Sequence, residues 1–327
     1  MRVFEFCQVK YEQWKKNPIR FVAMTGYTVE WFGELLPYFK EVHDSYLSRY
    51  QINGKRRKGM RRFVLYANSP LPSIEERLAF ILSYLKLNPL QEQHADLFDM
   101  QQKQCYEFVH GLKTILDQAL ELACAMPAQT DSRLQDMLME ISAATTQQDS
   151  PATPLHLLHD ATERAIPRPQ DDQSQQDNYS GKKKRHTVKN AVVTTMLCLI
   201  LFVSPTLAGS THDKRIADHY YSIPKGCTLW QDSGYQGYRP QGVSIRQPKK
   251  KPRTREMTKE QKELNRYISS FRVRVEHAIC SVKRYRIAKD ECRLRKNHFV
   301  DNVFLCCAAL HNFRVLRQPF NYKIKLT

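Results

Sequence analysis

The chain has 327 residues, and 42% of them are hydrophobic, which is enough to build packed cores and excludes a wholly disordered polymer. It carries 51 lysines and arginines against 33 aspartates and glutamates, a formal net charge of +18. A charge of this size describes partners rather than fold, and it favours a polyanion such as nucleic acid. A generically basic protein is the alternative.

The cysteines and the apolar segments indicate a reduced, cytoplasmic protein. The nine cysteines include no C-x-x-C pair, which argues against a zinc ribbon or a thioredoxin-like site. The first residues show no signal-peptide pattern. The longest apolar run, 191–203, is shorter than the roughly 20 residues of a membrane-spanning helix. Its valines, isoleucine and threonines favour buried strands, so a membrane protein is the least favoured interpretation.

The N-terminal 125 residues are predicted to be helical. Residues 1–70 form a helical region in which Thr28 caps a helix. Residues 71–125 contain three helices, of which the first begins at an S-x-x-E capping box at Ser73. The second helix covers 90–98, and the third begins at a D-x-x-Q pattern at Asp99. A short helix, a tight turn and a longer helix form a helix-turn-helix, although a plain helical bundle fits the same pattern. Candidate contacts to bases or phosphates at the start of the third helix are Gln101, Gln102, Lys103 and Tyr106.

A polar segment, 126–153, is predicted to be a linker, and a domain of different character follows at 154–318. This domain is predicted to contain strands followed by helices. The strands are 155–160, 185–194, 197–204, 228–231 and 243–245, and the helices are 213–221, 256–286 and 297–316. A mixed sheet with flanking helices in this order is typical of the α/β ribonuclease H-like fold.

Three acidic residues occupy positions suited to chemistry in this domain. Asp160 ends the first predicted strand, Asp232 ends the fourth, and Glu276 lies inside the helix at 256–286. If the two strands are adjacent, their carboxylates can share metal ions, to which the helix adds a third ligand. Oxygen ligands of this kind suit two Mg²⁺ or Mn²⁺ ions, which catalyse phosphodiester displacement. The alternative is that each acid merely pairs with a neighbouring lysine or arginine.

Basic residues surround these acids in the sequence. Residues 246–296 contain 18 lysines and arginines against 6 acidic residues. A second cluster, placed to contact DNA, consists of Lys182, Lys183, Lys184 and Arg185. Tyrosines that could stack on bases are Tyr179, Tyr235 and Tyr238.

The motifs around these residues resemble those of DDE transposases of bacterial insertion sequences, in the insertion-sequence-five group. The matching pieces are Asp160-Ala161-Thr162-Glu163, Tyr179 to Asn190, Gly209 to Lys214, Asp232-Ser233-Gly234-Tyr235, Arg272 to Ile279 and Ala308 to Phe313. The segment from Thr25 to Phe32 and the helices of 71–120 resemble the family's DNA-end-binding region.

The resemblance implies a catalytic and metal-binding triad of Asp160, Asp232 and Glu276. Arg272 and Lys283 keep the family's spacing around the last acid, Arg272 to orient the carboxylate and Lys283 to reach a DNA phosphate. The pair His212-Asp213 is a candidate for a supporting role near the metals; alternatively, Asp213 is a helix-starting acid.

Family enzymes bind the terminal inverted repeats of their insertion sequence, cleave there and join the 3′-hydroxyl ends to target DNA. The resemblance therefore implies two Mg²⁺ or Mn²⁺ ions per active site, DNA as partner and a homodimer or larger synaptic assembly. It implies no membrane and no small-molecule substrate, and a nucleoid-associated place in a bacterium. The alternative is a decayed or domesticated copy that only binds DNA, to which the apolar, glycine-free turn at 195–199 points.

Overall fold

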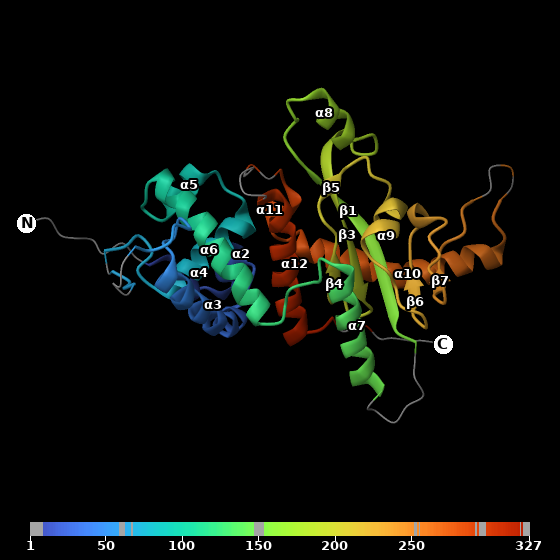
Figure 1. Cartoon of the computed structure of the whole chain (residues 1–327), viewed down its shortest axis with the longest axis horizontal. Helices are drawn as coiled ribbons and strands as arrows, with labels where there is room; N and C mark the ends of the chain where they lie inside the picture. The colour runs from blue at the N-terminus through green and yellow to red at the C-terminus, as the bar shows by residue number, and fades with distance from the viewer. Residues whose placement is uncertain are drawn as a thin grey trace, which may run out of the picture. The chain divides into compact units, whose positions relative to one another are not determined.

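The computed structural model divides the chain into two compact units (Figure 1). The helical unit comprises Met1–Met126 and Arg284–Asp290, and the sheet unit comprises Pro127–Lys283 and Glu291–Thr327. The structure describes residues 9–58, 63–66, 68–146, 154–251, 254, 256–291, 293, 299–320 and 322.

Helices build the first unit, as the sequence predicts. They are α1 (Lys10–Lys15), α2 (Pro18–Thr25), α3 (Val29–Arg49), α4 (Ile74–Leu87), α5 (Gln91–Leu97), α6 (Gln102–Leu122) and α11 (Arg286–Lys289). The predicted cap at Thr28 is confirmed, because its side chain accepts a hydrogen bond from the backbone of Trp31. Aromatic rings fill the contact between the first three helices, where Phe21 and Phe32 pack edge to face.

The predicted start of the third helix at Asp99 is wrong. Helix α6 begins at Gln102, and Gln101 is its N-cap residue, held by the Gln104 side chain. Asp99 instead adopts a left-handed conformation with φ of 49° in the turn after α5. Asp99 and Met100 both donate backbone hydrogen bonds to carbonyls of α5, which closes this turn.

The capping box predicted at Ser73 forms only in part. The Ser73 hydroxyl accepts from the Glu76 backbone at 3.1 Å. The Glu76 carboxylate points elsewhere and accepts from the backbone N–H groups of Lys10 and Tyr11, each at 2.8 Å. These are two of the unpaired donors at the start of α1, whose own N-cap residue makes no side-chain bond. A buried acid of α4 therefore caps α1.

Residues 284–290, which were predicted to belong to the catalytic domain, pack in the helical unit instead. The helix expected over 256–286 ends at Val282 as α10 (Lys259–Val282), and α11 follows as a separate turn in the helical unit. The Lys86 ammonium donates to the Arg284 carbonyl at 3.0 Å. Gly26 has a φ of 80°, and a methyl group there would lie 3.2 Å from the Tyr285 ring. The assignment of 284–290 to the catalytic domain is thus wrong, because packing overrides sequence position.

The second unit is built on a mixed sheet. Its strands are β1 (His156–Ala165), β2 (Tyr179–Ser180), β3 (Arg185–Thr195), β4 (Ile200–Val203), β5 (Leu207–Ala208), β6 (Thr228–Trp230) and β7 (Ser244–Arg246). The two long strands, β1 and β3, pair antiparallel, and β2, β4 and β5 each pair antiparallel with β3. On the other side of β1, β6 and then β7 add parallel strands.

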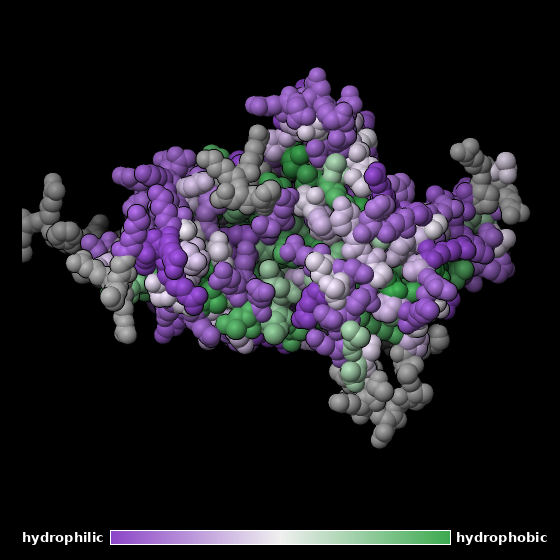
Figure 2. Space-filling model, in the orientation of Figure 1, coloured by the Kyte–Doolittle hydropathy of each residue, from purple (hydrophilic) through white to green (hydrophobic). Residues whose placement is uncertain are grey.

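Helices cover both faces of this sheet (Figure 1). Leucines of α7 (Asp131–Thr146) and apolar residues of α9 (Asp213–Tyr220) share one hydrophobic cluster with Leu157 and Leu229. On the other face, Phe271 of α10 stacks on Trp230 at 4.5 Å, and α12 (Phe299–Arg317) packs beside α10. Helix α8 (Asp172–Asn178) has no buried residue, and the surface there is almost uniformly hydrophilic (Figure 2).

The predicted linker is largely a helix of the sheet unit. Residues 131–146 form α7, whose Leu134 and Leu138 are fully buried. Before it, Ala128 exchanges backbone hydrogen bonds with β4, at 2.8 Å to Leu201 and 2.9 Å from Val203. The polar composition hides an apolar stripe in which Leu134, Leu138 and Ile141 recur at helical spacing.

The apolar run 191–203 is confirmed as buried strands, since it supplies most of β3 and β4. By length and composition, one helix of the described residues could cross a membrane. It is α12, whose apolar stretch is 72% buried inside the protein, which is typical of a core helix.

The glycine-free turn at 195–199 is held from inside the protein. Cys198 takes the left-handed conformation, with φ of 65°, that glycine would otherwise occupy. His311 bonds the Cys198 carbonyl at 2.8 Å, and Asn312 bonds both the N–H and the carbonyl of Ile200. The turn is apolar because it packs under α12, so its composition is no sign of decay.

The Glu76 cap generates a prediction about stability. Replacing Glu76 by alanine leaves the Lys10 and Tyr11 N–H groups without their acceptor, and we expect a loss of about 1–3 kcal/mol in the free energy of unfolding. Urea unfolding followed by circular dichroism measures it. Glu75→Ala is the matched control in the same helical turn, and equal losses in both variants would contradict the cap.

Candidate active site

Strand pairing brings together the segments that lead to the first two predicted acids. The parallel pairing of β1 with β6 aligns His156 with Thr228 and Leu158 with Trp230. Continued by two residues, the same register sets Asp160 beside Asp232, on the face that α10 covers. The expectation that Asp160 ends its strand is wrong, because β1 continues to Ala165. Asp232 follows β6 and caps the short helix η1 (Ser233–Tyr235), its carboxylate accepting from Ser233 at 2.6 Å.

A buried hydrogen bond lies on the other face, directly beside these acids. The Nε2 atom of His159 bonds the side-chain oxygen of Gln231 at 3.1 Å, and Nδ1 bonds the Tyr221 hydroxyl at 2.7 Å. The Tyr235 ring stacks on His159 at 3.8 Å. Burial lowers the pKa of His159 to about 3, so the imidazole is neutral and its Nε2–H donates to Gln231. This pair joins the residues that precede Asp160 and Asp232.

The guanidinium of Arg272 lies between two of the predicted acids. Its Nη1 is 3.6 Å from the Asp232 carboxylate and its Nη2 is 4.0 Å from that of Glu276. The arginine side chain is 12% exposed, whereas that of Glu276 is 54% exposed. Because Arg272 and Glu276 are four residues apart on α10, they share one side of the helix. The buried Nε of Arg272 has no hydrogen-bond partner among the described residues, which leaves one donor available.

The Asp160 carboxyl carries the most perturbed charge of the site. The pKa of Asp160 is raised to about 6, chiefly by burial and to a smaller extent by the nearby carboxylates of Asp232 and Asp213. A hydrogen bond from the Ala161 backbone and the charge of Arg272 act in the opposite direction. Burial outweighs these two effects, so the Asp160 carboxyl binds its proton more tightly than a free aspartate does.

This donor set fits a divalent cation in part. Asp160 and Asp232 are hard oxygen ligands on one sheet face, as Mg²⁺ and Mn²⁺ prefer. Within the described residues, no group of three His, Cys, Asp or Glu side chains is close enough together to hold a metal ion. The structure thus brings two predicted ligands together and connects Glu276 to them through Arg272.

A second charged cluster stands beside the site, and its central residue, Lys189, was not among the residues predicted from the sequence. The Lys189 ammonium lies 3.0 Å from the Asp213 carboxylate and 3.9 Å from that of Glu163, although Lys189 is buried in β3. His212, predicted to act with Asp213, instead caps α9 from the surface and accepts from the Lys214 backbone. The sequence signal that could have identified this cluster is a lysine within an apolar strand, because a buried charge requires acidic partners.

Of the remaining residues that were predicted to contact DNA, some are exposed and others are buried. Lys283 is tied to β1, since its ammonium donates to the Glu163 carbonyl at 3.2 Å. Tyr235 and Tyr238 are buried, so their predicted stacking on bases is wrong, whereas Tyr179 is exposed. In the helical unit, Tyr106 is half-buried against His110. The exposed candidates are Gln101, Gln102, Lys103, Lys182, Lys183, Lys184 and Arg185.

Comparison with known proteins agrees with both units. Residues 159–312 match the family model of the DDE superfamily endonuclease, and residues 69–122 match that of the helix-turn-helix of DDE superfamily endonuclease. Together the matches cover more than half of the chain, which belongs to the DDE superfamily of transposase endonucleases.

One curated relative supports the same family. The "Probable transposase for insertion sequence element IS702" of Microchaete diplosiphon is 31% identical over 144 residues, which are 44% of this chain and 51% of the relative. The chain thus spans about half the length of this relative. No solved structure gives a significant match.

The raised pKa of Asp160 predicts that replacing this residue by asparagine increases the stability of the protein in a pH-dependent way. The native carboxyl binds a proton more tightly than the unfolded one, whose pKa is near 3.8, so wild-type stability falls as pH rises towards 6 and beyond. Asp160→Asn avoids this loss. With chelator present, we expect the variant to be more stable than wild type by about 2–3 kcal/mol at pH 7, and by much less at pH 4.5.

Urea unfolding across this pH range tests the expectation. Asp136→Asn, at an exposed position of α7, is the matched control and should show no such pH dependence. A variant that is destabilised at pH 7 would contradict the raised pKa.

Proposed function

We propose that this chain is a transposase of the insertion-sequence-five group. It binds the terminal inverted repeats of its insertion sequence, cleaves DNA there and joins the 3′-hydroxyl ends to target DNA. The observation that carries the proposal is the parallel pairing of β1 with β6 just before Asp160 and Asp232, within a segment that matches DDE endonucleases. The helix-turn-helix match supplies the means to hold the DNA end.

The topology supports a ribonuclease H-like fold for the sheet unit. Three antiparallel strands, β1, β3 and β4, are followed by β6 and β7 parallel to the first. This arrangement positions the first and fourth main strands side by side and gives their carboxylates one common face.

In this proposal the triad works around a bound divalent cation. Mg²⁺ or Mn²⁺, two ions per site, would activate the attacking oxygen and stabilise the leaving oxygen. Asp160 and Asp232 would hold the ions, and Glu276 on α10 would complete their ligand set. Arg272 orients the carboxylates of Asp232 and Glu276 and keeps their charge balanced. The Lys189 and Asp213 pair supports the site from the opposite face, with His212 at the start of α9. Lys283 fixes β1 against the end of α10.

The enzyme is favoured over a decayed copy that only binds DNA. All three acids are present, and the turn at 195–199 is held by His311 and Asn312 rather than eroded. Transposition joins two ends, so we propose a homodimer or larger assembly, acting on DNA in the bacterial cytoplasm.

Cleavage of a terminal-repeat duplex tests the enzyme. In Mg²⁺ or Mn²⁺ we expect nicking at the repeat end by wild type, and a loss of at least about a hundredfold in Asp232→Asn, because the amide is a poor metal ligand. A denaturing gel with an end-labelled strand gives the rate. Asp136→Asn is the matched control and should cleave at the wild-type rate. Binding without cleavage by wild type would establish the DNA-binding copy instead.

Two substitutions at the start of α6 test the helix-turn-helix. Lys103→Ala should weaken binding of all duplexes and lower the salt dependence by about one phosphate contact. Gln102→Ala should lose about 1–3 kcal/mol of preference for the terminal repeat over unrelated DNA. Fluorescence anisotropy at several salt concentrations measures both. Gln118→Ala, exposed near the other end of α6, is the control, and an equal effect there would exclude α6 as the reading helix.

A further inference from the structure

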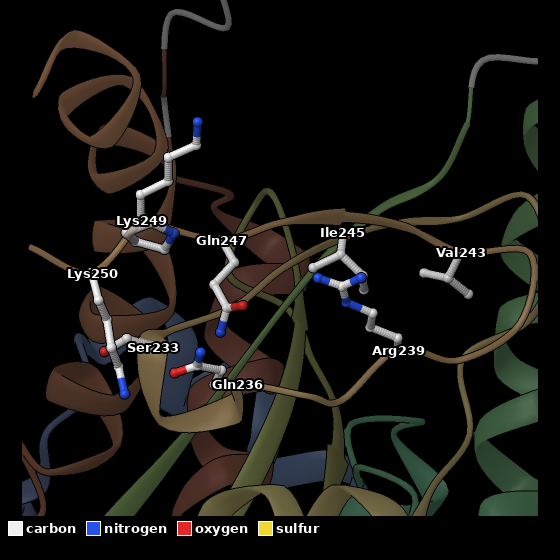
Figure 3. A pocket seen from close by; sticks show the side chains of 9 residues that line it. Ser233, Gln236, Arg239, Val243, Ile245, Gln247, Lys249 and Lys250 are labelled. Atoms are coloured by element: carbon white, nitrogen blue, oxygen red, sulfur yellow. The ribbon is translucent and has the colours of Figure 1, made fainter. Parts of the chain in front are cut away.

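A cavity of about 680 Å³ opens next to Asp232 in the sheet unit (Figure 3). Its walls come from η1, from β7 and from the segments that flank this strand. The lining residues are Ser233, Gln236, Arg239, Val243, Ile245, Gln247, Pro248, Lys249 and Lys250. Because Ser233 directly follows Asp232, whatever occupies the cavity lies beside the predicted reaction centre.

The lining selects a ligand with negative charge and a hydrogen-bonding edge. It combines three cationic side chains with two amide side chains, and it contains no carboxylate. Val243 and Ile245 add an apolar wall, and Arg239 also lines the cavity (Figure 3). The side chains of Gln236 and Gln247 extend toward each other in the middle of the cavity (Figure 3). Aliphatic side chains can pack against a nucleobase, an amide can bond its edge, and cationic side chains can bind its phosphate.

Hydrogen bonds hold the cavity walls in place. The Gln247 side chain donates to the Asp232 carbonyl at 2.6 Å, which fixes the wall to the site. The backbone of Lys249 exchanges two hydrogen bonds with the Asn265 side chain of α10, at 2.8 and 2.9 Å. The lysine ammonium groups therefore stand on a segment anchored to the helix that carries Arg272 and Glu276. Gln236 is exposed and has no anchoring role among the described contacts of its side chain, so it is the amide available to a ligand.

We propose that this cavity binds one unpaired nucleotide of the DNA strand, adjacent to the bond that is cleaved at Asp160 and Asp232. Lys249, Lys250 and Arg239 take the phosphates, and Gln236 takes the base edge. The volume suits one nucleotide, because ligand pockets of this order hold a single small molecule and a stacked duplex is far wider. Figure 2 shows a small hydrophobic area among hydrophilic side chains where β6 and β7 lie, as such a subsite requires. The inference rests on the proposed function.

The experiment separates phosphate from base recognition. Binding of a fluorescent (dT)8 strand and of the same strand without bases is measured by anisotropy, with chelator and at several salt concentrations. We expect wild type to bind (dT)8 about three- to tenfold more tightly than the abasic strand. Gln236→Ala should abolish this preference and leave the salt dependence unchanged. Arg239→Ala should weaken both strands and lower the salt dependence by about one phosphate contact.

The matched control is Arg133→Ala, which removes one exposed arginine of the same unit far from the cavity lining in sequence. It should leave both affinities within about twofold, as expected for an exposed side chain. Equal binding of the two strands by wild type would overturn base recognition, and an Arg239→Ala variant identical to the control would overturn the cavity as a DNA site. Because no cleavage is measured, a failure of the transposase proposal shows separately in the nicking assay.

Discussion

The hydrogen bond between His159 and Gln231 is the constraint on which the site depends. It ties β1 to β6 at the residues before Asp160 and Asp232, in a stretch where β6 has already ended. Two negative carboxylates on neighbouring strands repel each other, and without a tie the end of the short parallel pair would be free to separate. Burial keeps the imidazole neutral, so the tie adds no further charge beneath the acids.

Charge balance governs the surroundings of this tie. Arg272 offsets the carboxylates on the α10 face, and Lys189 is offset by Asp213 and Glu163 on the opposite face. The buried Lys189 thus has two carboxylates nearby, as burial of a charge in a low-dielectric interior requires. The exposed lysines of the sheet unit include Lys182, Lys183 and Lys184, which lie on a segment suited to a polyanion.

Helix α10 connects the chemistry to the proposed DNA subsite. It carries Arg272 and Glu276 toward the sheet, and through Asn265 it anchors the lysine-bearing segment that lines the cavity beside Asp232. One helix thus carries Glu276 and Arg272 and also anchors the segment whose lysines would bind the substrate strand. Sites supported in this way keep their geometry better than sites built on free loops.

The sequence by itself determined the helical and sheet regions and the family, and it singled out three candidate acids, because periodicity, caps and motifs are local signals. Only the tertiary structure decided that Asp160 lies within β1, that 131–146 is a helix of the sheet unit and that 284–290 packs with the helical unit. It also decided the roles of His159, Gln231 and Lys189. These features depend on which strands become neighbours and which side chains are buried together. Contacts between residues that are distant in the chain produce no periodic pattern in the sequence.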